Sequence, residues 1–166
     1  MREVREEISD LLSSEREDRF FCPKEARKKA MDFLARREYG QRELIRKLAN
    51  KGYDREVTEQ AVCGLTQDGL QSDQRFAESF VQSRIHQGKG PVRIRLDLGQ
   101  RGVSEGVVEA AINESDADWR ALARVAKNKK FGQRPAVDFT AKAKQMRFLQ
   151  YRGFEQEHIQ VAVDGD

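Results

Sequence analysis

Leu48-Ala49-Asn50-Lys51-Gly52-Tyr53-Asp54 joins an amphipathic stretch to a glycine, and the same pattern returns twice further along the chain. It returns over residues 98–104 and 149–155. In each copy a leucine stands four residues before the glycine, a lysine or arginine just before it and an apolar residue just after it. The three glycines, which are 50 and 51 residues apart, are Gly52, Gly102 and Gly153. This agreement indicates an internal repeat.

Each copy of the repeat predicts a helix, a tight turn and a second helix. Glycine just after a helix end adopts the left-handed backbone conformation that other side chains oppose. The preceding lysine or arginine stands in the last helical turn, where a positive charge suits the helix dipole. Asp54 and Ser104 are suited to cap the next helix. A further helix precedes each pair, since apolar residues such as Ala26, Ala30 and Phe33 recur at helical spacing.

We therefore predict an all-α fold of three tandem three-helix repeats that form an elongated, curved array. The repeats are expected at residues 21–70, 71–115 and 116–166, after a polar acidic leader of residues 1–20 that is either a loose helix or disordered. The predicted helices cover residues 24–38, 41–51, 54–68, 72–86, 91–101, 104–114, 117–130, 138–151 and 155–163. Residues 133–138 are expected to form a loop.

The composition excludes several classes of protein. The 166 residues are 36% charged and 38% hydrophobic, and no apolar run approaches the ~18 residues that a membrane span needs. The sequence starts with no secretory signal pattern. Only two cysteines occur, Cys22 and Cys63, so a disulfide framework is excluded and a reduced, cytoplasmic setting is expected.

The net charge of +3 is unevenly distributed. Residues 1–23 carry −3, residues 24–70 carry +3, residues 71–115 are balanced and residues 116–166 carry +3. A moderately basic body of this kind attracts a polyanion weakly. The same values also fit a helical protein with a solvated surface of mixed charge, because nucleic-acid-binding domains usually have clustered charge and a pI above about 9.

The sequence offers no set of residues for catalysis or metal binding. His86 and His158 are isolated, and together with Cys22 and Cys63 they lack a ligand spacing such as C-x-x-C. We therefore expect no enzyme activity, no metal and no cofactor. His158 is expected on a polar helix face, Cys63 in the core and Cys22 partly exposed. Gly88-Lys89-Gly90-Pro91 lacks the Walker spacing and predicts a helix–helix turn with proline at the first helical position.

A cluster of cationic residues distinguishes the middle repeat: Arg84, Lys89, Arg93, Arg95 and Arg101. Three of them surround the start of the helix predicted at 91–101, where the helix dipole also favours anions. Two interpretations stay open. The cluster binds phosphate or a partner's carboxylates, or its arginines pair internally with Asp97, Asp73 or Glu105.

Aromatic residues gather in the third repeat beside several lysines. Such a combination is able to stack on unpaired bases. The helical spacing of Phe148 and Tyr151 instead predicts that these two side chains belong to the core. Leu122, Val125 and Ala126 likewise share one predicted apolar face.

Four motifs follow one another at fixed spacing through the middle repeat. They are Ser72-Asp73-Gln74-Arg75-Phe76-Ala77, Ser83-Arg84, Gly88-Lys89-Gly90-Pro91-Val92-Arg93-Ile94-Arg95 and Leu98-x-x-Arg101-Gly102-Val103. Together they resemble the central signature of the RecX family. The resemblance covers residues 24–163 and includes Phe148-Leu149-x-Tyr151-Arg152-Gly153-Phe154 in the third repeat. Gly40-Gln41 departs from the family pattern, because many members have a serine at this helix start.

This resemblance implies a bacterial regulator of the RecA recombinase that catalyses no reaction itself. Members of the family bind RecA, mainly as its filament on single-stranded DNA, and inhibit its ATPase, strand-exchange and coprotease activities in DNA repair and the SOS response. We therefore expect RecA as partner, weak direct DNA binding and a monomer. The expected binding residues are Arg84, Lys89, Arg93, Arg95 and Arg101, with Arg46 and Lys47 as a second patch. The alternative is an autonomous DNA-binding helical-repeat protein.

Overall fold

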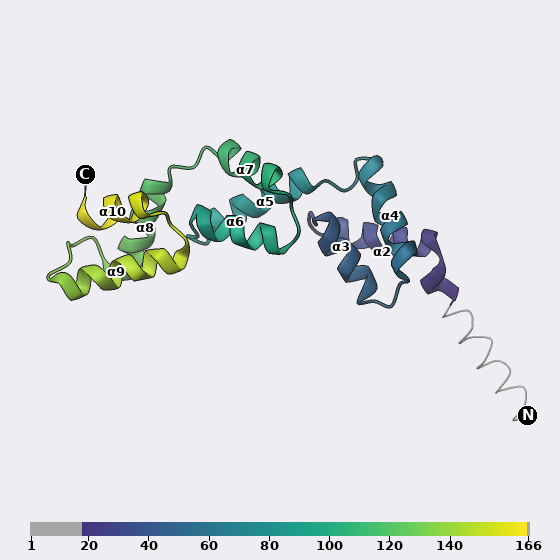
Figure 1. Cartoon of the computed structure of the whole chain (residues 1–166), viewed down its shortest axis with the longest axis horizontal. Helices are drawn as coiled ribbons and strands as arrows, with labels where there is room; N and C mark the ends of the chain where they lie inside the picture. Colours follow the sequence, from purple (N-terminus) through teal and green to yellow (C-terminus); the bar gives the residue numbers. More distant parts are fainter. Residues whose placement is uncertain (1–17, 166) are drawn as a thin grey trace, which may run out of the picture. The chain divides into compact units, whose positions relative to one another are not determined.

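The computed structural model describes residues 18–165, and this part of the chain contains helices and no β-strand (Figure 1). A short 3-10 helix, η1 (Arg19–Phe21), precedes nine α-helices. These are α2 (Pro23–Leu34), α3 (Gln41–Ala49), α4 (Arg55–Gln67), α5 (Asp73–His86), α6 (Pro91–Gln100), α7 (Glu105–Glu114), α8 (Trp119–Phe131), α9 (Phe139–Arg152) and α10 (Gln156–Asp164). The predicted all-α class is confirmed, and each predicted helix corresponds to one of the nine. Of the predicted leader, residues 1–17 lie outside the described residues.

The largest difference from the predicted helix bounds is at the end of α2. This helix ends at Leu34, four residues before the predicted end at 38. Beyond it the side chain of Tyr39 is buried, with its ring centroid 6.0 Å from that of Phe33. The chain leaves the helix early because Tyr39 packs back onto the same core. The loop predicted at residues 133–138 is confirmed between α8 and α9.

The chain divides into two compact units, residues 1–73 and 74–166. In the described part of the first unit, α2, α3 and α4 pack around one apolar core (Figure 1). That core consists of Ala30, Phe33, Tyr39, Leu44, Leu48, Val62 and Leu65. Asp54 caps α4 as predicted, because its Oδ2 accepts hydrogen bonds from the amides of Glu56 and Val57 at 3.0 and 3.3 Å.

The start of α3 is capped by a side chain from further along the chain. The cap residue of this helix is Gly40, which has no side chain to accept from the first free amides. Asp73 supplies the acceptor, since its Oδ1 lies 2.7 Å from the amide of Gln41. Gln71, which is 1% exposed, orients this carboxylate through a 2.9 Å hydrogen bond from its Nε2. The helix start that departs from the family pattern thus has a substitute cap.

The second unit contains two apolar cores. The first lies among α5, α6 and α7, and its buried residues are Phe76, Ala77, Val81, Ile94, Leu98, Val103, Val108, Ala111 and Ile112. The second lies among α8, α9 and α10, and its buried residues are Ala123, Leu149, Phe154, Ile159, Ala162 and Val163. Trp119, at the start of α8, packs against both cores. It therefore anchors α8 and joins the two repeats of this unit. Ser104 precedes α7 without a capping hydrogen bond from its side chain, contrary to prediction.

Main-chain hydrogen bonds hold the start of α6 against the turn between α9 and α10. The amide of Gly90 donates to the carbonyl of Arg152 at 2.9 Å, and the amide of Val92 donates to that of Gly153 at 3.0 Å. Both glycines are required by this approach. A Cβ on Gly90 would overlap the Gly153 carbonyl, and a Cβ on Gly153 would overlap the backbone of Arg93. The second and third repeats therefore meet through their backbones.

The burial of one residue in the first unit was predicted wrongly. Cys63 is exposed, whereas the sequence predicts it in the core. The buried face of α4 is formed by Thr58, Ala61, Val62 and Leu65. Residue 63 lies about 100° past Val62 on a 3.6-residue helix and therefore faces away from the core. Cys22 is partly exposed, as predicted.

None of the helices between residues 18 and 165 combines the length and the apolarity that a membrane crossing requires.

Candidate functional site

Two arginines of the middle repeat pair with one carboxylate on α6. The Nε of Arg93 lies 2.9 Å from Oδ1 of Asp97, and the Nε of Arg84 lies 3.5 Å from its Oδ2. The longer separation is an ion pair without a well-formed hydrogen bond, and Arg84 Nε has no other acceptor. Asp97 is only 7% exposed. Internal pairing with Asp97, one of the two interpretations open from the sequence, is therefore present.

Two further cations adjoin this pair. Lys89 lies in the turn before α6, and Arg152 at the end of α9 donates from Nη1 to the carbonyl of Gln87 at 2.9 Å. Burial lowers the pKa of Lys89, and the neighbouring charges of Arg152, Arg93 and Arg84 lower it further. We call Arg84, Lys89, Arg93, Arg152 and Asp97 the Asp97 cluster. With four cations and one carboxylate it keeps a net charge of +3, so internal pairing does not exhaust its capacity for anions.

Arg101 borders the Asp97 cluster on the side of α5. Its guanidinium carbon lies 4.9 Å from the ring centroid of Phe80, and that of Arg84 lies 4.4 Å from the same ring. Its Nη1 donates to the main-chain carbonyl of Asp97 at 3.1 Å. The two guanidinium groups therefore share Phe80 as a cation–π partner.

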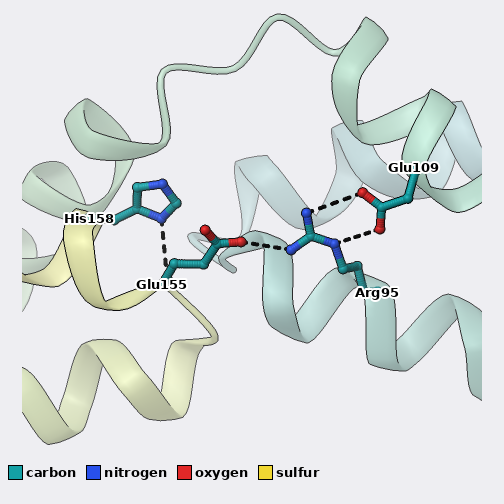
Figure 2. Close-up of polar contacts among 4 residues, drawn as sticks. All are labelled: Arg95, Glu109, Glu155 and His158. Atoms are coloured by element: carbon teal, nitrogen blue, oxygen red, sulfur yellow. Dashed lines mark hydrogen bonds and ion pairs between the residues drawn. The ribbon is translucent and has the colours of Figure 1, made fainter.

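Arg95 has a different role from its neighbours on α6. Its guanidinium donates to both carboxylate oxygens of Glu109 at 2.7 and 3.2 Å and to Oε1 of Glu155 at 2.8 Å (Figure 2). Hydrogen bonding to Glu109, above all, raises the pKa of Arg95. Glu109 belongs to α7 and Glu155 precedes α10, so Arg95 bridges the second and third repeats. Two carboxylates surround this one cation, and it is not part of the Asp97 cluster.

The two predicted residues of the second patch lie in the last turn of α3, in the first unit. Arg46 is exposed. Lys47 is half-buried, and its Nζ lies 5.0 Å from the ring centroid of Phe33 and 5.3 Å from that of Tyr39. Its charge thus also serves packing within the first unit.

The expected attraction of anions by the free start of α6 needs correction. Proline at position 91 has no amide hydrogen, and the amides of Gly90 and Val92 donate to the carbonyls of Arg152 and Gly153. The carboxyl end of α9 therefore occupies the amino end of α6. Binding of an anion by the Asp97 cluster depends on its side chains.

Sequence reasoning missed two residues at this site. Arg152 was interpreted only as a cation suited to a helix end, and Tyr151 was predicted in the core. Tyr151 is 78% exposed, and Nζ of Lys89 lies 5.9 Å from its ring centroid. Phe148 is partly buried against the core of the third repeat, as predicted. The signal for Arg152 was the repeated cation before each turn glycine, but only the contact of Gly90 with Gly153 brings Arg152 to Lys89.

The histidine of α10 is buried, although the sequence predicts it on a polar face. His158 is 7% exposed, and its Nδ1 accepts a hydrogen bond from the amide of Glu155 at 3.2 Å (Figure 2). It caps the helix to which it belongs. Among residues 18–165 no three histidine, cysteine or acidic side chains gather in a way that would hold a metal ion.

Three family models match successive parts of this chain. They describe the first, second and third three-helix domains of RecX and match residues 26–63, 72–112 and 116–163, respectively. A regulatory protein RecX of Pseudomonas entomophila is 45% identical over 144 residues, which are 86% of this chain and 92% of that protein. A regulatory protein RecX of Halorhodospira halophila is 40% identical over 81% of this chain and 83% of that protein.

Two solved structures share the fold. A crystal structure of regulatory protein RecX superimposes with a TM-score of 0.72 at 22% sequence identity, covering 86% of this chain and 71% of that one. A crystal structure of RecX from Lactobacillus salivarius gives a TM-score of 0.71 at 18% identity, covering 86% and 94%.

Proposed function

Because the chain belongs to the RecX family, we propose that it is a regulator that binds the RecA recombinase and inhibits its ATPase, strand-exchange and coprotease activities. The form of RecA that it binds is chiefly the filament on single-stranded DNA. The proposal includes no reaction catalysed by the regulator, in keeping with the name regulatory protein that its curated relatives carry. It acts as a monomer in the cytoplasm.

The observation that carries the proposal is the excess charge of the Asp97 cluster. Two cations, from α5 and α6, pair with a single carboxylate, and two more, from α9 and the turn before α6, lie beside them. A surface with net charge +3 attracts acidic side chains of a protein or the phosphates of DNA within a filament. Such binding opposes the motions of RecA protomers that ATP turnover requires.

The residues of the proposed surface differ in role. Arg84, Lys89, Arg93 and Arg152 form the Asp97 cluster, and Arg101 extends it on the side of Phe80. Arg95 is a positioning residue, because its bonds to two glutamates hold the third repeat next to the cluster.

Lys89→Glu tests the proposal. It changes the cluster charge from +3 to +1, and we expect a rise of about tenfold or more in the concentration that halves RecA ATPase activity on single-stranded DNA, equivalent to ~1.4 kcal/mol. The measurement is a titration of RecA ATPase from sub-stoichiometric to equimolar regulator. Inhibition far below equimolar indicates capping of filament ends, and inhibition only near equimolar indicates coating of the filament.

The matched control is Lys144→Glu, which makes the same change of charge at an exposed position of α9. It should inhibit like the unmodified protein. Circular dichroism melting of both variants checks that the helices remain folded. If Lys89→Glu inhibits as strongly as Lys144→Glu while both are folded, the Asp97 cluster is not the binding surface. If the unmodified protein leaves RecA turnover unchanged, the proposed function itself is wrong.

A second candidate function, autonomous binding of single-stranded DNA, is supported by the exposed ring of Tyr151 beside Lys89. An exposed aromatic side chain next to a cation is typical of surfaces that stack unpaired bases. This function predicts equal affinity for bare labelled oligothymidine and for the RecA filament, with a steep dependence on salt concentration. Fluorescence anisotropy at 50 and 200 mM salt distinguishes the two.

A further inference from the structure

A hollow of about 420 Å³ opens beside the Asp97 cluster, between the end of α5, α8 and α9. Its volume is in the range of roughly 300–1,000 Å³ typical of ligand pockets. Five apolar side chains line it: Ile85, Leu122, Val125, Ala126 and Phe148. All five are partly or fully exposed, and Val125 is 62% exposed although the sequence predicts it in the apolar face of α8. The hollow thus presents apolar surface that the fold does not cover.

The rim of this hollow is cationic. Lys129 and Lys130 of α8 and Arg152 of α9 border it, and none of its lining residues within the described chain is acidic. Three positive charges around an apolar floor complement a segment that combines an apolar side chain with carboxylates. Arg152 also belongs to the Asp97 cluster, so the two surfaces are continuous.

The aromatic ring in the hollow is already occupied by the chain's own side chains. The ring of Phe131 meets Phe148 edge-on, with centroids 5.4 Å apart. Nζ of Lys130 lies 5.4 Å and the guanidinium carbon of Arg152 lies 5.2 Å from the Phe148 centroid. A base that stacks on this ring would have to displace a cation. The remaining floor is aliphatic and suits a buried leucine, isoleucine or phenylalanine better than a nucleic-acid base.

We propose that this hollow binds a segment of a partner protein in which an apolar anchor residue is flanked by acidic residues. The anchor fills the space above Ile85, Leu122 and Ala126, and the flanking carboxylates contact Lys129, Lys130 and Arg152. Affinity comes from desolvation of the anchor, and the rim selects acidic over basic segments. The site does not depend on the partner being RecA, because it is defined by its own apolar floor and charge.

Titration of the ¹⁵N-labelled protein with a defined peptide tests this site. The probe is acetyl-Glu-Asp-Leu-Phe-Asp-Glu-amide, and the comparison peptide has serine in place of leucine and phenylalanine. We expect saturable shifts of the amides of Ile85, Gly88, Leu122 and Ala126, with a Kd of about 1 mM or tighter for the probe. The serine peptide should bind at least fivefold more weakly. Equal binding of both peptides, or shifts absent from these amides, would overturn the proposal.

Two variants separate this site from general attraction of acidic peptides. Val125→Glu places a carboxylate in the hollow, four residues before Lys129 on the same helix, and is tolerated because Val125 is exposed. It should weaken binding of the probe at least fivefold. Val137→Glu adds the same charge at a residue that is 92% exposed and outside the hollow, and should bind like the unmodified protein. Equal loss in both variants counts against the site.

Oligothymidine is the final comparison in the same titration. It should leave the amides around the hollow unshifted at concentrations that saturate with the probe. If it shifts them as strongly as the peptide, the hollow is a nucleic-acid site and the proposal is wrong. Because RecA is absent from all of these measurements, their failure leaves the ATPase test of the proposed function unaffected.

Discussion

The turn glycines of the first and third repeats have the same backbone conformation but different neighbours. Gly52 has φ +96° and Gly153 has φ +87°. In each turn the amide of the residue after the glycine donates a hydrogen bond to the carbonyl of the leucine four residues before the glycine. A Cβ on Gly52 would touch the Phe20 ring at 3.4 Å, whereas a Cβ on Gly153 would overlap the backbone of Arg93. The turn belongs to every repeat, but the close backbone approach distinguishes the third from the first.

Because of this difference, the turn of the third repeat has a structural role that the turn of the first repeat lacks. In the first repeat the glycine serves the left-handed turn, and the ring of Phe20 next to it is a side chain that can shift. In the third repeat the glycine also admits the start of α6, which brings Arg152 into the Asp97 cluster. Substitutions at these glycines should therefore separate the loss of unfolding free energy caused by the left-handed turn from the loss caused by the close approach of the two backbones.

The largest effect is expected for Gly153→Ala. The left-handed conformation costs a side chain about 1–2 kcal/mol, and overlap with a fixed backbone adds about 1–3 kcal/mol. We expect the free energy of unfolding of the second unit to fall by about 3 kcal/mol, measured by urea denaturation followed by circular dichroism. Hydrogen exchange of the Val92 amide should accelerate as its acceptor moves away. A loss of about 1–2 kcal/mol or less, which the left-handed conformation alone accounts for, would contradict the close approach.

An intermediate effect is expected for Gly90→Ala, which tests the approach without the turn. Gly90 has φ −87°, a conformation open to any residue, so the cost comes only from overlap with the Gly153 carbonyl. We expect a loss of about 2 kcal/mol by the same denaturation measurement. Protection of the amides at positions 90 and 92 should decrease, whereas that of amides inside α4 should not. Equal loss of protection in both units would indicate general destabilisation instead.

The smallest effect is expected for Gly52→Ala. Only the left-handed conformation opposes it, because Phe20 is able to move, and the expected loss is about 1 kcal/mol. Gly69→Ala is the matched control, since Gly69 has φ +71° and open space around its Cα. The two variants should lose similar free energy of unfolding. A loss at Gly52 as large as that at Gly153 would show that the first repeat also depends on a close contact at its turn.

The sequence was a good guide to the helices, because each repeat marks its own turn. Leucine, cation, glycine and apolar residue recur in order, and these are local signals that require no knowledge of the neighbouring repeat. The errors concern which face of a helix is covered. Tyr151 and Val125 have helical spacing typical of core residues, yet both are exposed because no helix of the described chain covers them. His158 was predicted wrongly because its side chain is buried and its Nδ1 accepts a hydrogen bond from the amide of Glu155 at the start of the same helix.

The candidate site was predicted only in part, because the sequence records local patterns but not the contacts between repeats. Arg84, Lys89 and Arg93 are close in sequence, and their pairing with Asp97 was one of the two open interpretations. Arg152 joins them from 59 residues beyond Arg93 in the chain, through contacts between backbones that no local pattern records. The roles of Arg93 and Arg95 also differ, although only Ile94 separates them. Arg93 pairs with Asp97 on α6 itself, whereas Arg95 points to the other side of the helix and pairs with Glu109.

The end-to-end arrangement of α9 and α6 has a consequence for chimeric proteins. Its hydrogen bonds join main-chain atoms, so the donors and acceptors are the same whatever side chains surround them. Exchange of the third repeat between relatives should succeed only if glycine is kept at both positions 90 and 153. A chain cut after α7 would leave the amides of Gly90 and Val92 to water and would remove α8 and α9, which supply most of the lining of the apolar hollow. Residues 74–166 should therefore be exchanged between relatives as one structural unit, although two cores lie within it.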